Sequence, residues 1–351
     1  MASVAVFKTG LDLLYYSGTA AALRPLYAGC GAIFMLHHVR PWSPRPGGFT
    51  PNAGLEVTPE FLDAAISRVR ALGWDLVSLD EAARRLEEGE EGRPFACFTL
   101  DDGYRDNLEH ARPVFARHGC PFAIYVAPAI ADGNCELWWL GLEQAIARSE
   151  TVEGEIAGQG FRLSCTGLAG KLQAWKQLYW PVRAMEHHAQ RRWIRAFCEA
   201  HGVDLDAVCR AVAMGWDEIR VIAADPLCTI GAHTIHHVNL KSLPADEAVD
   251  EIVGSADRIE AETGRRPRHF AFPYGEETSA GPRDFELARA AGFTTAVTTR
   301  KGLLYPAHRE HLTALPRFSL AGDYQKLRYL DTLLTGVPFA LFNGFRALNV
   351  A

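Results

Sequence analysis

The feature that most constrains the fold is a regular alternation of short apolar runs with helix-forming stretches. About seven apolar runs recur, bounded by glycine, proline or polar residues: 31–39, 95–100, 121–128, 228–237, 269–275, 294–299 and 315–320. Helical patterns stand between them. One covers 57–74, where Thr58 is a preferred N-cap and Pro59 suits the first helical position. Such alternation predicts an α/β fold with parallel strands inside and helices outside, and the strand count suits a barrel of βα units.

One long stretch interrupts this alternation. Residues 132–226 are rich in helix formers, Trp and charge, so we expect a mostly helical insertion. Its start, CELWWLGLEQ, places two Trp side by side, which either pack the insertion on the barrel or stack on sugar rings. The chain has 351 residues, 48% of them hydrophobic, enough for one large core. We therefore predict a single domain over 1–351, with 132–226 inserted and an apolar tail at 327–351.

The charge and the cysteine content of the chain limit which partners and which cellular compartment can be expected. The formal net charge is −6, without the basic patch that nucleic-acid binding requires, so no nucleic-acid partner is expected. Eight scattered cysteines without a CxxC pair predict free thiols in a reducing compartment. The N-terminus lacks the layout of a signal peptide, so we expect a cytoplasmic protein.

Both ends of the chain are more apolar than solvated termini usually are. Residues 3–29 and 327–345 either pack into the core or meet a membrane surface. Peripheral association with the inner face of the membrane therefore stays open, and the sequence leaves the oligomeric state undetermined.

Two adjacent carboxylates follow one of the apolar runs. FTLDDGYRD places Asp101 and Asp102 directly after 95–100 and before a glycine. An Asp-Asp-Gly turn would explain one of them. Two at the end of a strand suggest two tasks: one oxygen on a metal ion and another free to take a proton from water.

A histidine pair ends another run. His233 and His237, four apart in HTIHH, can point the same way and share one ion, although such pairs are more often structural. Functional residues of parallel α/β folds lie after the carboxyl ends of strands, so the aspartates and histidines are expected to meet. Two His and one Asp suit a first-row transition metal with open positions for water and substrate.

These segments together resemble a known family. FTLDDGYRD, GAHTIHHVNL and HFAFPYG are similar, in order, to three motifs of the polysaccharide deacetylases, the NodB-homology family of carbohydrate esterases. The resemblance implies a distorted (β/α)7 barrel. It also implies metal ligands Asp102, His233 and His237, a general base Asp101, and a backbone N–H of Tyr274 that stabilises an oxyanion. A metal would neutralise one carboxylate and let its neighbour stay ionised.

The chain departs from the commonest family pattern in two places. A late Leu-x-His motif with a general-acid histidine is absent, but MLHHV at 35–39 resembles the front element of a circularly permuted subgroup, with His37 rather than His38 as the acid. The arginine that often precedes P-Y-G and orients the base is replaced by Ala271. Arg317, in LPRFSL, is the candidate substitute, unless it is an ordinary surface or core-capping residue.

The resemblance predicts a metal-dependent hydrolase that removes N-acetyl, or O-acetyl, groups from a carbohydrate or glycan precursor. The expected ion is Zn²⁺, with Co²⁺, Ni²⁺ or Mn²⁺ as substitutes. A deformylase of a lipid-linked amino sugar would use the same residues. A non-catalytic glycan-binding protein or an assembly scaffold is the alternative of another class. The particular sugar, linkage, acyl group and metal are not determined by the sequence.

Overall fold

Seven parallel strands form a closed barrel in the computed structural model, which describes residues 4–43, 47–89 and 92–350. The order around the barrel is β1-β12-β11-β10-β9-β6-β5, and β5 pairs back with β1, with Phe34 opposite Phe98. The strands are β1 (Gly31–Leu36), β5 (Phe95–Leu100), β6 (Phe122–Val126), β9 (Cys228–Ala232), β10 (His269–Ala271), β11 (Thr295–Lys301) and β12 (Leu315–Ser319). The predicted barrel and its seven strands are confirmed.

The strands are apolar on both faces because one face packs inside the barrel and the other packs against the surrounding helices. In FACFTL of β5 every residue is buried, since one face looks into the barrel and the other packs against helices. On the helix-covered side, the ring of Phe34 contacts those of both Phe98 and Phe318. A short strand β4 (Asp75–Leu76) extends the β5 edge. A separate pair joins β2 (His38–Val39) to β3 (Glu56–Val57).

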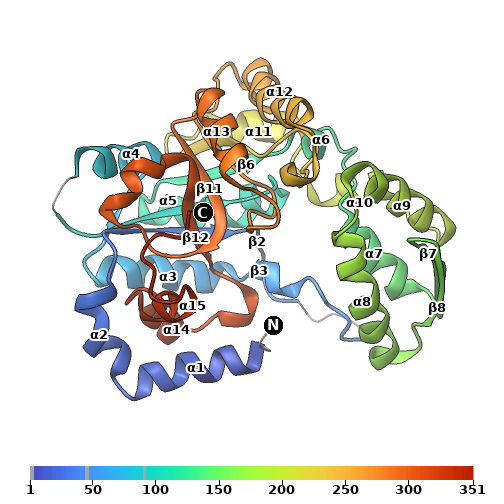
Figure 1. Cartoon of the computed structure of the whole chain (residues 1–351), viewed down its shortest axis with the longest axis horizontal. Helices are drawn as coiled ribbons and strands as arrows, with labels where there is room; N and C mark the ends of the chain where they lie inside the picture. The colour runs from blue at the N-terminus through green and yellow to red at the C-terminus, as the bar shows by residue number, and fades with distance from the viewer. Residues whose placement is uncertain (1–3, 44–46, 90–91, 351) are drawn as a thin grey trace.

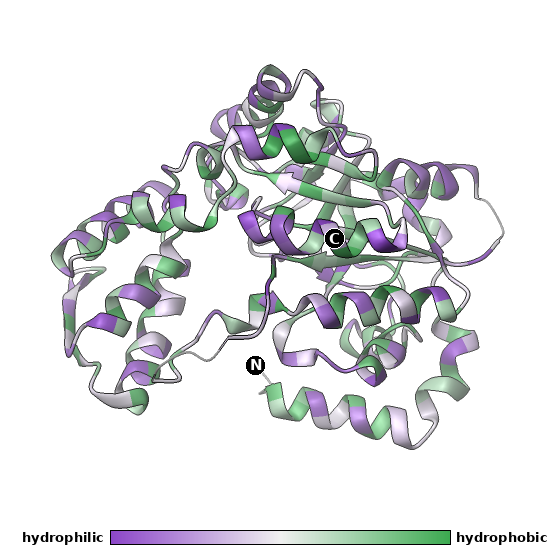
Figure 2. Ribbon diagram, turned by 180° about the vertical axis from the view of Figure 1, so that it is seen from behind, coloured by the Kyte–Doolittle hydropathy of each residue, from purple (hydrophilic) through white to green (hydrophobic). Residues whose placement is uncertain are grey.

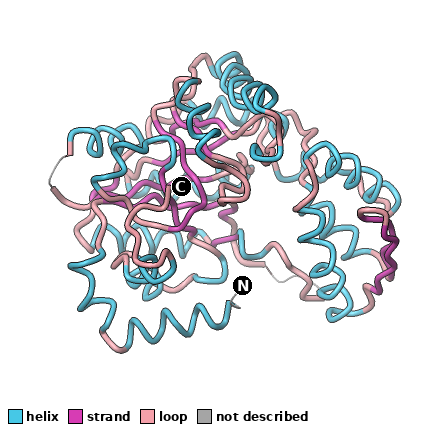
Figure 3. The backbone as a smooth tube through the Cα atoms, viewed as in Figure 1, coloured by secondary structure: helices cyan, strands magenta, loops and turns pink. Residues whose placement is uncertain are grey.

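Helices surround the barrel, as Figure 3 shows. Thr58 caps the first of them, accepting a hydrogen bond from the Phe61 N–H at 3.1 Å, as the sequence predicted. The surrounding helices are α3 (Pro59–Ala71), α4 (Leu79–Glu88), α5 (Arg112–His118), α12 (Ala245–Thr263) and α13 (Pro282–Ala290). Single-turn and irregular helices complete the connections: η1 (Ala53–Leu55), η2 (Asn107–Ala111), η3 (Leu240–Ser242), η4 (Pro306–Ala314) and η5 (Gly322–Tyr324).

The segment between β6 and β9 forms a lobe beside the barrel (Figure 1). It contains α6 (Pro128–Ala131), α7 (Trp138–Arg148), α8 (Gly167–Arg183), α9 (His187–Ala200), α10 (Leu205–Val212) and α11 (Trp216–Ala223). A hairpin of β7 (Thr151–Ile156) and β8 (Gln159–Ser164), which the sequence analysis did not anticipate, lies at its outer edge. The lobe has its own apolar core, whereas Ile219 and Ile222 of α11 pack into the barrel core.

The first two and last two helices of the chain pack together below the barrel (Figure 1). They comprise α1 (Val4–Tyr16), α2 (Thr19–Tyr27), α14 (Leu327–Leu333) and α15 (Val337–Phe342). Asp12 of α1 accepts from Arg328 at 2.6 Å, and most of 329–340 is buried, so the apolar tail is largely part of the core. Among the described residues, no helix is long and apolar enough to cross a membrane. All eight cysteines are free, as predicted.

Candidate active site

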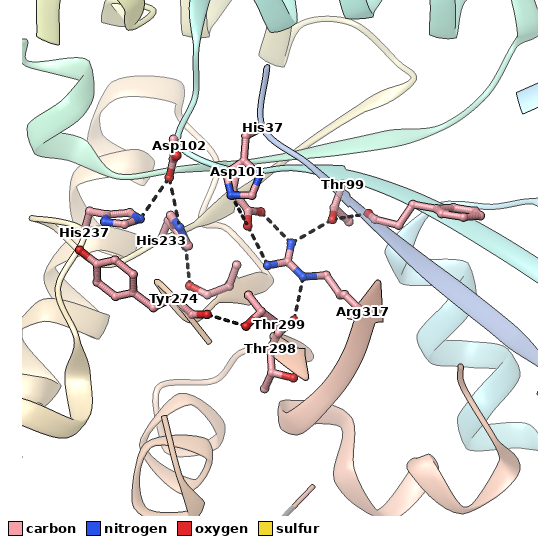
Figure 4. Close-up of polar contacts among 12 residues, drawn as sticks. His37, Thr99, Asp101, Asp102, His233, His237, Tyr274, Thr298, Thr299 and Arg317 are labelled. Atoms are coloured by element: carbon pink, nitrogen blue, oxygen red, sulfur yellow. Dashed lines mark hydrogen bonds and ion pairs between the residues drawn. The ribbon is translucent and has the colours of Figure 1, made fainter. Parts of the chain in front are cut away.

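The carboxyl ends of the barrel strands surround a cavity of about 220 Å³ that contains most of the predicted site residues. Figure 4 shows them turned toward one another. The predicted residues that line the cavity are His37, Asp101, Asp102, His233, His237 and Tyr274. Arg317 lies beneath the cavity, bonded to Asp101. The fold thus brings all seven predicted residues together from five different strand ends.

The backbone is strained where these side chains are aimed inward. Asp102, His237 and Tyr274 have φ values of 72°, 54° and 61°, in the left-handed region that residues other than glycine seldom adopt. Such conformations are unfavourable and cluster at functional sites, where the surrounding structure holds them. The His233–His237 pair therefore converges through a turn after β9 rather than along a helix.

Three side chains point at one position with atoms that carry lone pairs. His233 Nε2 and His237 Nε2 lie 3.4 and 3.2 Å from Asp102 Oδ1. His233 donates its Nδ1 hydrogen to the Ala271 carbonyl oxygen at 2.7 Å, so in the neutral ring Nε2 faces the carboxylate as an acceptor. Two acceptors this close, all but excluded from water, are stabilised by a cation or a proton between them.

The residues fit a divalent metal ion. Asp102, His233 and His237 each offer one ligand atom, and these atoms lie within 4.8 Å of one another. Asp102 Oδ1 is buried and receives no hydrogen bond from the described part of the chain. The hydrogen bond from His233 to a backbone carbonyl is the kind of support that fixes the ring of a ligand histidine. One carboxylate and two imidazoles are typical of a catalytic zinc site with open positions.

Arg317 holds Asp101 in a two-pronged ion pair. Its Nη1 and Nη2 each donate to one carboxylate oxygen at 2.7 Å, and Nε donates to the Thr298 carbonyl at 2.9 Å. Burial alone would raise the pKa of Asp101, but the guanidinium outweighs burial and holds that pKa below its usual value. Each oxygen keeps a further lone pair, so Asp101 stays ionised and can still accept a proton.

The two adjacent histidines after β1 lie in different environments. His37 lines the cavity, with Nε2 4.0 Å from Asp101 Oδ2. Burial lowers the pKa of His37, against the attraction of Asp101 and Asp102. His38 points away from the cavity: its Nδ1 lies 2.7 Å from Asp106 Oδ2, and its ring stacks on Tyr104. The arrangement therefore suits the predicted choice of His37, and it gives His38 a structural role.

Tyr274 lines the cavity and has a backbone N–H that is unengaged in the described chain. Within the described chain its backbone N–H donates to no protein group, while its carbonyl accepts from Thr299 Oγ1 at 2.5 Å. Trp138 Nε1 donates to its hydroxyl at 2.9 Å, which fixes the ring against the lobe. An unengaged N–H beside the predicted ligands is the arrangement needed for stabilising negative charge on a substrate oxygen.

Of the residues that the inserted lobe supplies to the site, sequence reasoning singled out only the Trp pair. Trp138, Trp139, Tyr179 and Arg183 also line the cavity. Arg183 donates to Glu276 at 3.0 Å and so bridges the lobe to the loop after β10. The Trp pair was noticeable as a sequence feature, but nothing local in α8 shows that Tyr179 and Arg183 would reach the barrel.

Comparisons with known proteins identify the family. The profile of the polysaccharide deacetylase family matches residues 88–296, more than half of the chain. The chain therefore belongs to the polysaccharide deacetylase family, whose members are hydrolases that act on amide bonds of acylated carbohydrates. The family is generally metal-dependent, which agrees with the buried Asp102, His233 and His237. No curated protein sequence matches the chain.

Solved structures share the fold at low sequence identity. The deacetylase PplD of Streptococcus pyogenes, solved with acetate, has 16% identity and a TM-score of 0.56, over 86% of this chain and 97% of its own. IcaB from Ammonifex degensii has 17% identity and a TM-score of 0.54, over 87% of this chain and 97% of its own. A polysaccharide deacetylase from Bacillus cereus has 13% identity and a TM-score of 0.53, over 86% and 68%.

Proposed function

We propose that this chain is a metal-dependent N-deacetylase of an amino sugar in a glycan or a glycan precursor, with Zn²⁺ as its ion. The observation that carries the proposal is the convergence of Asp102, His233 and His237 next to the Asp101–Arg317 pair. A non-catalytic glycan-binding protein would have no need for this arrangement, because binding a sugar requires neither an ionised base nor unpaired ligand atoms.

Asp101 is the proposed base. A bound divalent ion supplies Lewis acidity toward the acyl carbonyl and lowers the pKa of water. Asp101 takes one proton from the attacking water at a carboxylate oxygen, while Arg317 keeps that carboxylate oriented. The water oxygen bonds to the acyl carbon, and the negative charge that develops on the carbonyl oxygen receives a hydrogen bond from the Tyr274 N–H.

His37 is the proposed acid, on the front strand of a permuted chain. When the C–N bond breaks, the protonated ring transfers its proton to the leaving nitrogen, and the products are acetate and a free amine. His37 Nε2 and Asp101 Oδ2 lie 4.0 Å apart, so the proton that Asp101 takes from water can pass to the histidine after each turnover. The position of β1 between β12 and β5 supports this proposal, because His37 then follows a strand next to the one that Asp101 follows.

The proposal is tested by release of acetate or formate from N-acylated amino-sugar oligomers and lipid-linked precursors, using Zn²⁺-reconstituted protein. We expect acetate, one free amine per acetate, and no product with Asp101→Asn, although that variant should keep its metal. Formate without acetate would reassign the acyl group. An Asp101→Asn variant as active as the wild type would exclude Asp101 as the base.

A further inference from the structure

The first helix of the chain is apolar on two opposite faces. Its inner face packs on α14 and η5, through the buried Leu11 and through Phe7, whose ring lies 5.4 Å from that of Tyr324. Its outer face carries Leu13, which is 66% exposed, and the exposed Tyr16. Thr9, on the same outer face, bonds its hydroxyl to a carbonyl of the preceding turn at 3.0 Å, which hides its polar group. Because a surface helix normally presents polar residues outward, folding alone does not account for this outer face.

Other exposed apolar residues adjoin α1 at the packed ends of the chain. Leu26 of α2 is 74% exposed, and α15 packs on α2, with the Phe345 ring 6.3 Å from that of Tyr27. Figure 2 shows hydrophobic residues along α1 at the lower edge of the molecule. We call these exposed residues the terminal patch: Leu13, Tyr16, Leu26, Leu341, Phe342 and Phe345.

Basic residues that are not paired with acidic ones lie around the terminal patch. Its exposed basic residues form no ion pair with an acidic group of the described chain: Arg24, Lys301, Lys326 and Arg346. The Lys301 ammonium lies 4.6 Å from the centre of the Phe342 ring. Nearby carboxylates are already paired, Asp12 with Arg328 at 2.6 Å and Asp331 with Arg68 at 2.7 Å. The surface therefore combines apolar side chains with free cations.

The start of α1 leads toward the rim of the cavity. Lys8 of α1 lies 3.8 Å from Asp323 of η5. η5 in turn packs against η1, where a Cβ on Gly322 would collide with the Ala53 carbonyl. Leu55 of η1 lines the cavity. In Figure 1 the start of α1 lies on the side of the barrel that faces the lobe. A surface that covered α1 would thus lie beside the mouth of the site.

We propose that the terminal patch docks the protein on an anionic phospholipid bilayer. Apolar side chains between free basic residues are the pattern of helices that lie in a membrane interface. A protein partner would be recognised by shape and paired polar groups, whereas the patch offers cations without acceptors. Joined to the proposed function, on which this last step rests, docking would direct the enzyme to glycan precursors carried on lipids at the inner face of the membrane.

Vesicle flotation tests the docking. The full chain is mixed with phosphatidylcholine vesicles with and without phosphatidylglycerol, at low and high salt. The wild type should float with the anionic vesicles and less so at high salt. Leu13→Glu and Leu26→Glu should each lower the partition coefficient roughly tenfold or more. Val221→Glu, at an exposed apolar residue of α11, is the matched control and should float like the wild type.

Two flotation results would overturn the proposal: wild-type protein that stays in solution with both kinds of vesicle, or flotation that Leu13→Glu does not change. A wild-type dimer that Leu13→Glu separates would also overturn it, because the terminal patch would then bind a second copy of the chain. Acetate release from a soluble substrate is measured on the same samples. It should not change in Leu13→Glu, so a failure of docking and a failure of the proposed chemistry give different results.

Discussion

The ion pair beneath the cavity offers the sharpest perturbation of the site. Arg317 and Asp101 are almost excluded from water, with side-chain exposures of 0% and 4%. Arg317→Met keeps the volume but removes the charge, and losing one partner of a buried ion pair costs about 3–5 kcal/mol of the free energy of unfolding. Burial is the largest influence on Asp101, and only the weaker attraction of His233 and His37 would then oppose it, so we expect the pKa of Asp101 to rise above its usual value.

The sign of the pH dependence follows from that shift. In the wild type the folded pKa of Asp101 lies below the unfolded one, so the ion pair stabilises the fold above the unfolded pKa, and this contribution is lost as the pH falls through the folded pKa. In Arg317→Met the pKa of Asp101 should lie higher in the folded than in the unfolded protein. Protonation of Asp101 then removes the cost of burying an unpaired carboxylate. The stability difference between the two proteins should therefore shrink as the pH falls toward about 4.

The pH dependence of activity tests the Arg317–Asp101 ion pair independently of stability. Since the proposed base must be ionised, the acidic limb of kcat/KM should move to higher pH in Arg317→Met, with a larger loss at pH 6 than at pH 9. In a double-mutant cycle by denaturant unfolding, Asp101→Asn and Arg317→Met should be coupled by roughly 2 kcal/mol or more. Additive destabilisation, together with an equal loss of activity at every pH, would refute the argument that Arg317 keeps Asp101 ionised.

Further predictions concern the acid and the substrate wall. Replacing His37 by Ala should leave the metal content intact and lower kcat about 100- to 10,000-fold. His38→Gln should instead lower the melting temperature and change kcat little. The opposite pattern would exchange the roles of the two histidines. Because the protonated form of His37 gives the proton, wild-type activity should fall as the pH rises through its lowered pKa, and His37→Ala should lack this limb in a pH–rate profile. Tyr179→Ala should raise KM for oligomeric substrates severalfold with little change in kcat, and a loss confined to kcat would place Tyr179 in the chemistry instead.

The barrel was predictable because its determinants are local. Each strand is a short apolar run, and the signals that begin a helix, such as Thr58 with Pro59, are adjacent in sequence and present in the structure. The site residues follow strand ends, so strand order alone brings Asp102 close to His233 and His237. Their positions could be inferred from motifs, although their roles stay predictions.

The lobe was only partly predictable, for a physical reason. The strands β7 and β8 are mostly exposed and polar, so they lack the apolar alternation that marks a strand, and their pairing depends on each other. Tyr179 and Arg183 reach the cavity because α8 docks beside the barrel, a tertiary event without a local signature. Arg317 is an intermediate case: its strand was predictable, but its ion pair joins β12 to the end of β5, with β1 between them.

The most direct test of the account is a titration of metal-free protein with Zn²⁺ while acetate release and bound metal are both measured. The account predicts that activity rises in proportion to bound metal and stops at one equivalent per chain, and that His237→Ala neither retains this equivalent nor gains activity. Full activity in the metal-free protein, or one tightly bound equivalent in His237→Ala, would contradict it.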